Sequence, residues 1–150
     1  MFVKRLFAFV VAALLVTFAG GCVHDVTLTR APDSNLNTIK KVHVVLNPDD
    51  MGWATPPYIK SAMESRGYTA TVGFATEAPK DADALLVPNE KWMWDITMYL
   101  LSADLTMKDA KTGKILAAAH VQSSSFGRKS PEIVANEMVG EIFGAQTPKK

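Results

Sequence analysis

The 150-residue sequence has a single cysteine, Cys22, so no intrachain disulfide can form. Its only long apolar run, residues 6–18, has thirteen residues, which is too short for a membrane-spanning helix of about 20 residues. Excess charge of either sign is also missing, with 16 basic and 15 acidic side chains. Because nucleic-acid-binding proteins carry a basic excess, this balance argues against a nucleic-acid partner.

Enzyme and metal-site motifs are missing as well. Residues 112–114 (Thr-Gly-Lys) lack the upstream glycine and the following Ser or Thr of a phosphate-binding loop. Residues 123–125 are three serines without the flanking glycines of a nucleophile elbow. Asp49 and Asp50 are not followed by the ligand pattern of a calcium loop. We therefore predict a protein that is not an enzyme and that holds no cofactor or metal ion.

What the sequence does contain is an N-terminal leader. Lys4 and Arg5 give it a positive start, residues 6–18 are apolar, and residues 19–21 (Ala-Gly-Gly) are small and directly precede Cys22. This layout is typical of a secretory signal peptide that is removed. We predict that residues 1–21 are cleaved off, which leaves 129 residues beginning at Cys22. An uncleaved N-terminal anchor helix is the alternative.

The stretch that ends at Cys22 resembles the cleavage motif of bacterial lipoprotein precursors. Gly21 and Cys22 match the motif, whereas Ala19 stands where Leu is expected and Gly20 where Ala is usual. The resemblance implies a diacylglyceryl group on the Cys22 thiol and acylation, such as palmitate, on the new amino terminus. Two or more acyl chains anchor a protein stably to a membrane. Val23, where an Asp would retain the protein in the inner membrane, implies a periplasm-facing protein on the outer membrane.

The mature chain divides into three parts by composition. Residues 22–40 are polar and without a period, which predicts the lipidated Cys22 followed by a flexible tether that includes His24 and Asp25. Residues 41–144 predict one domain, and residues 145–150 a tail. With Lys4 and Arg5 removed, the mature part carries 14 basic and 15 acidic side chains, so its charge is balanced too.

The domain is predicted to be α+β. A β-branched run at 42–46 predicts a strand, and Thr55 before two prolines predicts a helix start. Further strands are expected at about 68–74, 84–92, 97–108 and 115–123, and a last helix begins after Ser130. This order favours one mixed or antiparallel sheet of about five strands with two helices on one face.

Aromatic residues gather around the turn that follows the strand at 84–92. In the next strand, alternation places Leu101, Ala103, Leu105 and Met107 inward and Met98 and Leu100 outward, with Tyr99 inward. Exposed aromatic and apolar patches mark partner-binding surfaces. The predicted partner-binding residues are Trp92, Trp94, Asp95, Met98, Tyr99 and Leu100. In the alternative interpretation, loops or helices cover these residues and they belong to the core.

The same stretch resembles a group of uncharacterised proteobacterial envelope lipoproteins that have a Trp-x-Trp-Asp hairpin. Trp92, Trp94, Asp95 and Tyr99 match that pattern, together with residues 47–48 (Asn-Pro) and 66–68 (Arg-Gly-Tyr). The group has no established activity to carry over. Its fold resembles envelope domains of strand–helix–strand type, including lipoprotein activators of peptidoglycan synthases.

These observations predict a membrane-anchored periplasmic lipoprotein that acts as a non-catalytic binding or scaffolding module in the cell envelope. Its expected partners are the membrane, through the lipid on Cys22, and an envelope protein. The alternative is a small-ligand carrier or an enzyme that uses two strand histidines, His43 and His120, together with Asp95. A cleft that brings these three side chains together would favour the alternative.

Overall fold

The computed structural model describes residues 24–48, 55–125 and 127–144, so the leader, Cys22, Asp49 and Asp50 lie outside the described residues. The described residues form six strands and two α-helices, with two short 3₁₀ turns. In order they are β1 (His24–Arg30), η1 (Leu36–Thr38), β2 (Lys41–Val45), α2 (Pro56–Glu64), β3 (Thr69–Gly73), η2 (Ala75–Glu77), β4 (Ala84–Trp94), β5 (Met98–Asp109), β6 (Ile115–Ser123) and α3 (Pro131–Phe143).

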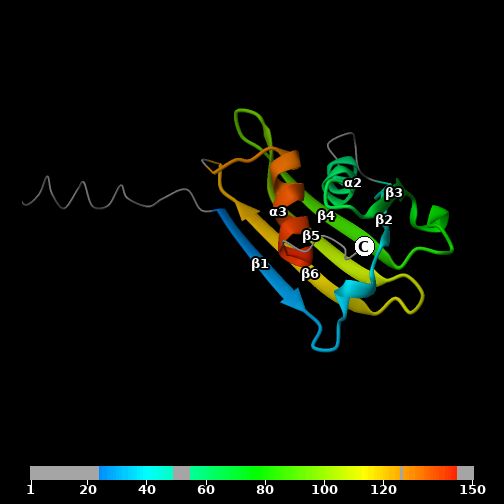
Figure 1. Cartoon of the computed structure of the whole chain (residues 1–150). Coiled ribbons are helices and arrows are strands. Elements are labelled where there is room, and N and C mark those ends of the chain that lie inside the picture. The colour runs from blue at the N-terminus through cyan, green and yellow to red at the C-terminus, as the bar shows by residue number, and fades with distance from the viewer. Residues whose placement is uncertain (1–23, 49–54, 126, 145–150) are drawn as a thin grey trace, which may run out of the picture.

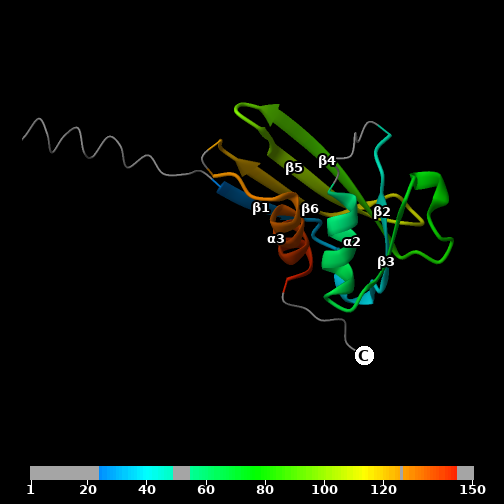
Figure 2. The ribbon, with the colours of Figure 1, turned by 90° about the horizontal axis from the view of Figure 1, so that it is seen from above.

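All six strands form one mixed sheet in the order β1-β6-β5-β4-β2-β3. In this order, the pairs β1–β6, β6–β5 and β5–β4 are antiparallel. The pairs β4–β2 and β2–β3 are parallel. Both helices lie on the same face of this sheet (Figures 1 and 2). The predicted α+β class, the mixed sheet and the two helices are thus confirmed, with six strands in place of five.

The sixth strand is the main correction to the predicted domain boundaries. Residues 24–30, expected in a flexible tether, form β1 and pair with β6 along their whole length, from His24 opposite Ser123 to Arg30 opposite Ala117. Val26 and Leu28 pack against the core, and Thr27 between them is polar. Two aliphatic residues give too short an alternation to be recognised in the sequence, and the pairing partner lies about 100 positions away.

The core fills the space between the sheet and the helices. Its largest fully buried side chains are Val42, Val44, Leu86, Leu105, Met107 and Val121 from the sheet, Ile59 and Met63 from α2, and Val134, Met138 and Ile142 from α3. The hydroxyl of Ser130 accepts a hydrogen bond from the Ile133 amide and caps α3 as predicted. Among the described residues, no helix is long and apolar enough to cross a bilayer.

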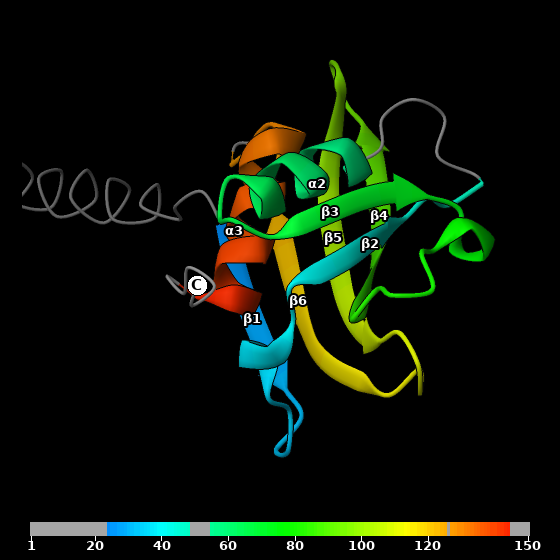
Figure 3. The same ribbon diagram turned by 45° about the vertical axis from the view of Figure 1, so that its right-hand side comes forward.

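The connection from β3 to β4 covers part of the face without helices. Because α2 carries the chain from β2 to β3 on one face, the right-handed return from β3 to β4 runs on the other face, and Figure 3 shows it turning through η2. His43 of β2 is only 2% exposed there. Its ring nitrogens hydrogen-bond the Thr71 hydroxyl at 2.8 Å and the Phe74 carbonyl at 3.1 Å.

A β-bulge changes which residues of β5 face the core. Lys91 pairs with Ser102 but Trp92 pairs with Leu100, so Leu101 is an extra residue on β5. The inward placement of Ala103, Leu105 and Met107 is confirmed, because all three are buried. The outward placement of Leu100 is wrong, since it is 3% exposed and part of the core, whereas Leu101 is half-buried. Strict alternation fails here because a bulge shifts the period by one residue.

Candidate functional site

The β4–β5 hairpin extends beyond the rest of the sheet. On one side, β2 pairs with β4 only at residues 84–86. On the other side, the pairing of β5 with β6 stops at Ser102 opposite Gln122. Residues 91–101 therefore form a two-stranded extension, which we call the hairpin arm (Figure 1). Within the described part of the chain, neither edge of this arm is paired with a third strand.

The end of the hairpin arm is apolar and exposed. Trp94 is 68% exposed, Ile96 84% and Met93 40%, and we call these three residues the apolar tip. Trp94 was predicted, whereas Met93 and Ile96 were not. The sequence signal for Ile96 is an isoleucine in a turn, between Asp95 and Thr97, where polar residues are usual. Exposed apolar residues gathered at one place mark a binding surface.

Trp92 has a different role from Trp94. Its ring is half-buried against the core, and its indole nitrogen donates a hydrogen bond to Glu90 Oε2 at 2.9 Å. Glu90 Oε1 in turn accepts hydrogen bonds from the backbone amide and the hydroxyl of Thr55, both at 2.5 Å. Thr55 is fully buried at the start of α2. Trp92 and Glu90 therefore fix the base of the arm to α2, while Trp94 points to solvent.

Arg128, in the loop between β6 and α3, fixes the arm from the other side. Its guanidinium donates to Asp95 Oδ2 at 2.9 Å and to the Thr97 hydroxyl at 2.8 Å. The same group lies 4.6 Å from the centre of the Tyr99 ring, which is a cation–π distance. Its Nε donates to the Ser125 carbonyl at 2.6 Å. No local pattern in the sequence could identify this residue, since Asp95 lies 33 positions away.

The predicted partner-binding residues therefore separate into three groups. Trp94 is exposed, and Asp95 is exposed and paired with Arg128. Trp92, Met98 and Tyr99 are half-buried on the arm. Leu100 belongs to the core and cannot contribute to a surface of the folded protein.

The residues of the enzyme alternative are not brought together. His120 lies on β6 and its Nδ1 is 2.7 Å from Asp104 Oδ1. His43 lies on β2, three strand positions from β6, which is about 14 Å at the usual strand spacing. Asp95 is at the far end of the hairpin arm. Across the described residues, no three His, Cys, Asp or Glu side chains are grouped so that they could hold a metal ion.

An open groove of about 460 Å³ lies at the carboxyl ends of β2 and β3. Its lining residues are Val45, Leu46, Asn47, Pro48, Phe74, Ala75, Thr76, Val87, Pro88 and Asn89. None of these lining side chains is ionisable, so they offer a ligand apolar contacts and amide groups but no acid or base.

The start of β1 is held by polar contacts to two other elements. His24 Nε2 lies 2.7 Å from Glu137 Oε2 of α3, and His24 Nδ1 lies 3.2 Å from the Ser123 hydroxyl of β6. Lys129 forms an ion pair with the same Glu137 carboxylate. Burial opposes ionisation of Glu137, but the hydrogen bonds from Lys129 and His24 outweigh it and hold the pKa of Glu137 below its usual value. The first described residue of the chain is thus firmly placed.

Comparison with known proteins identifies structural neighbours. No protein-family model matches the chain, and no curated protein matches it in sequence. Two structures of the PelC dodecamer from Paraburkholderia phytofirmans superpose with TM-scores of 0.57 and 0.54. Each is 14% identical to this chain, and the match covers 85% of this chain and 100% of PelC. These likenesses show a shared fold.

A further neighbour is a DUF4136 family protein from Bacteroides thetaiotaomicron. Its TM-score is 0.53 at 14% identity, and the match covers 84% of this chain and 98% of that protein. Because the identity is so low, the neighbour speaks for the fold alone. The predicted likeness to lipoproteins with a Trp-x-Trp-Asp hairpin stays a prediction.

Proposed function

We propose that this protein is a lipid-anchored, non-catalytic binding module of the bacterial cell envelope, held by acyl chains on Cys22 and facing the periplasm from the outer membrane. The hairpin arm is its binding surface. The observation that carries this proposal is the apolar tip, three exposed apolar residues on an arm that Glu90 and Arg128 hold in place. Ordering these residues in advance lowers the entropy that binding costs.

The lipid anchor is supported by the sequence around Cys22. A short apolar leader, small residues at 19–21 and the only cysteine of the chain occur together at the expected spacing. The non-catalytic role is supported by the separation of His43, His120 and Asp95. No nucleic-acid partner is proposed, because the charge of the mature chain is balanced.

The anchor is tested by labelling cells that express the full chain with a clickable palmitate analogue. We expect label on the wild-type protein and its recovery with outer membranes. The Cys22→Ala variant should carry no label and should leave the membrane fraction. Ala19→Leu, which brings the cleavage motif nearer to the lipoprotein pattern, is the matched control and should be labelled like the wild type. Membrane retention of an unlabelled Cys22→Ala protein would contradict the anchor.

The binding surface is tested separately, by placing a photo-crosslinking amino acid at position 94 in intact cells. Position 112 lies in the exposed turn at the opposite end of β5 and serves as the control site. We expect adducts with an envelope component from position 94 and none from position 112. Equal adduct patterns from the two positions would contradict a binding role for the arm.

A further inference from the structure

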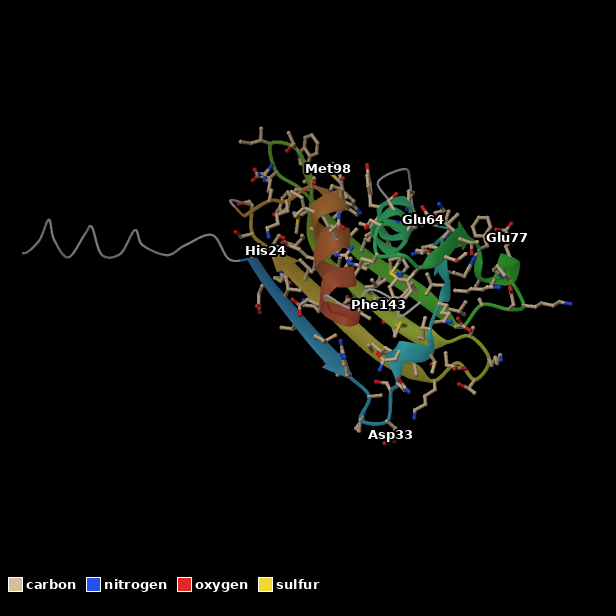
Figure 4. All side chains as sticks on the ribbon, in the orientation of Figure 1. His24, Asp33, Glu64, Glu77, Met98 and Phe143 are labelled. Carbon is tan, nitrogen blue, oxygen red and sulfur yellow. The ribbon has the colours of Figure 1, made fainter. Side chains whose placement is uncertain are left out.

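The start of β1 and the hairpin arm lie at the same end of the sheet. His24 pairs with Ser123, the last residue of β6, and the neighbouring Gln122 pairs with Ser102 of β5, where the arm begins to project. Figure 4 shows His24 and Met98 at this end and Asp33 at the opposite end. The amino terminus of β1 and the arm therefore leave the domain in the same general direction.

Only two residue steps separate Cys22 from His24. A fully extended chain spans at most about 3.6 Å per residue, so two residue steps can bridge no more than about 7 Å. His24 itself is fixed by β6 and by Glu137 of α3. A lipid on Cys22 would hold this end of the sheet directly at the bilayer, without a long tether between them.

The hairpin arm is long enough to reach the same surface. Ile96 lies six positions before Ser102, the residue level with the start of β1. At about 3.3 Å per residue this extends the arm by roughly 15–20 Å, allowing for the bulge. The arm thus reaches at least as far as Cys22 can, and its tip would meet the interfacial region of the bilayer.

The chemistry of the tip also fits a bilayer better than a folded partner. Met93 and Trp94 are consecutive strand residues, so their side chains lie on opposite faces of the arm. Ile96 extends the apolar surface over the turn. A folded partner covers one face of a hairpin, whereas a bilayer surrounds its end. The carboxylate of Asp95 is paired with Arg128, and tryptophan favours the membrane–water interface.

We propose that Met93, Trp94 and Ile96 insert into the interface of the bilayer that carries the lipid on Cys22, as a second and protein-borne membrane contact. This rests on the lipid anchor of the proposed function. The domain would then stand on the membrane in one orientation, with the hairpin arm and the start of β1 toward the lipid and the β5–β6 turn away from it. Because the contact is apolar, added salt should leave it unchanged.

The test uses the full lipidated protein in vesicles of phosphatidylethanolamine and phosphatidylglycerol, with and without brominated acyl chains that quench nearby tryptophan. We expect quenching and a blue-shifted emission in the wild type. Quenching should fall in Trp94→Phe, the difference reporting Trp94, and should persist in Trp92→Phe. Because Trp94 is exposed, its replacement removes no core contact.

A second pair of variants asks whether the whole tip is inserted. Ile96→Asp adds a charge to the tip and should abolish the quenching of Trp94, whereas Thr112→Asp in the opposite turn should leave it unchanged.

Equal quenching in wild type and Trp94→Phe, for protein that carries label on Cys22 and floats with the vesicles, would overturn the second contact alone. An unlabelled protein that does not float would overturn the anchor. Crosslinks from position 94 to protein rather than lipid would show a protein-binding tip and would also overturn the inference.

Discussion

Glu90 offers the sharpest test of how the hairpin arm is attached. The Glu90→Ala substitution removes the carboxylate that accepts hydrogen bonds from both Thr55 and the indole of Trp92. Thr55 is fully buried, so its amide and hydroxyl would lose their acceptor in a place with little access for water. The hydrogen bonds that join Glu90 to the start of α2 would then be lost.

The expected cost follows from those contacts. Each buried donor left without an acceptor costs about 1–3 kcal/mol. Thr55 contributes two such donors, whereas Trp92 is only half-buried. Some water will enter the space that the side chain leaves, so we expect a loss of about 2–4 kcal/mol in the free energy of unfolding. That is a large part of the 5–15 kcal/mol that stabilises a typical domain.

The assay is urea unfolding followed by circular dichroism, with two comparison variants. Glu90→Gln keeps a carbonyl oxygen for Thr55 but gives up the acceptor for Trp92, so it should cost only about 0.5–1.5 kcal/mol. Lys91→Ala, at the next and exposed position, should stay within about 0.5 kcal/mol of the wild type. A Glu90→Ala protein as stable as Lys91→Ala, or a Glu90→Gln protein as unstable as Glu90→Ala, would refute the proposed network.

Three further predictions concern the bulge, the arm and the start of β1. Leu100→Ala should cost about 2–5 kcal/mol in urea unfolding and Leu101→Ala markedly less, because only Leu100 is in the core; the reverse order would contradict the bulge. Arg128→Ala should cost about 0.5–1.5 kcal/mol through the lost cation–π and ion-pair contacts, and Arg128→Lys should recover part of it. The pKa of Glu137 is lower in the folded protein than its unfolded value near 4.5, so the ionised carboxylate stabilises the fold. This contribution to the free energy of unfolding is complete above pH 4.5 and is lost as the pH falls through the folded-state pKa. The stability gap between wild type and Glu137→Gln should therefore narrow in acid, and a gap that widens there would contradict this sign.

Local patterns in the sequence were sufficient for most of the domain. The strands after residue 40 and both helices follow from alternation, helical spacing and cap residues, each of which lies within a few positions of the element it defines. Ser130 at the start of α3 and Gly113, with φ of 71° in the β5–β6 turn, are such local signals. Elements of this kind can be predicted without knowing which residues they pack against.

The features that the sequence did not predict all depend on residues that are distant in the chain. β1 has only Val26 and Leu28 as aliphatic signal and becomes a strand because β6 offers it an edge. The bulge at Leu101 depends on how β5 pairs with β4 and β6 together. Arg128 meets Asp95 and Tyr99 only after the sheet and α3 are in place. Contacts between residues so far apart in the chain depend on the whole fold. The hydrophobic period of one segment therefore cannot predict them.

The strand at 24–30 also changes what Cys22 implies. A lipidated cysteine before a flexible tether of 18 residues would leave the orientation of the domain undefined, because such a tether spans tens of ångströms. The lipid that we propose on Cys22 lies two residues before a strand that β6, Ser123 and Glu137 hold in place, so it would fix one end of the sheet at the membrane. The apolar tip projects from that same end. Under the proposed anchor, the bilayer that carries the lipid would bury Trp94 and Ile96, which would give a physical reason for their exposure in the free domain.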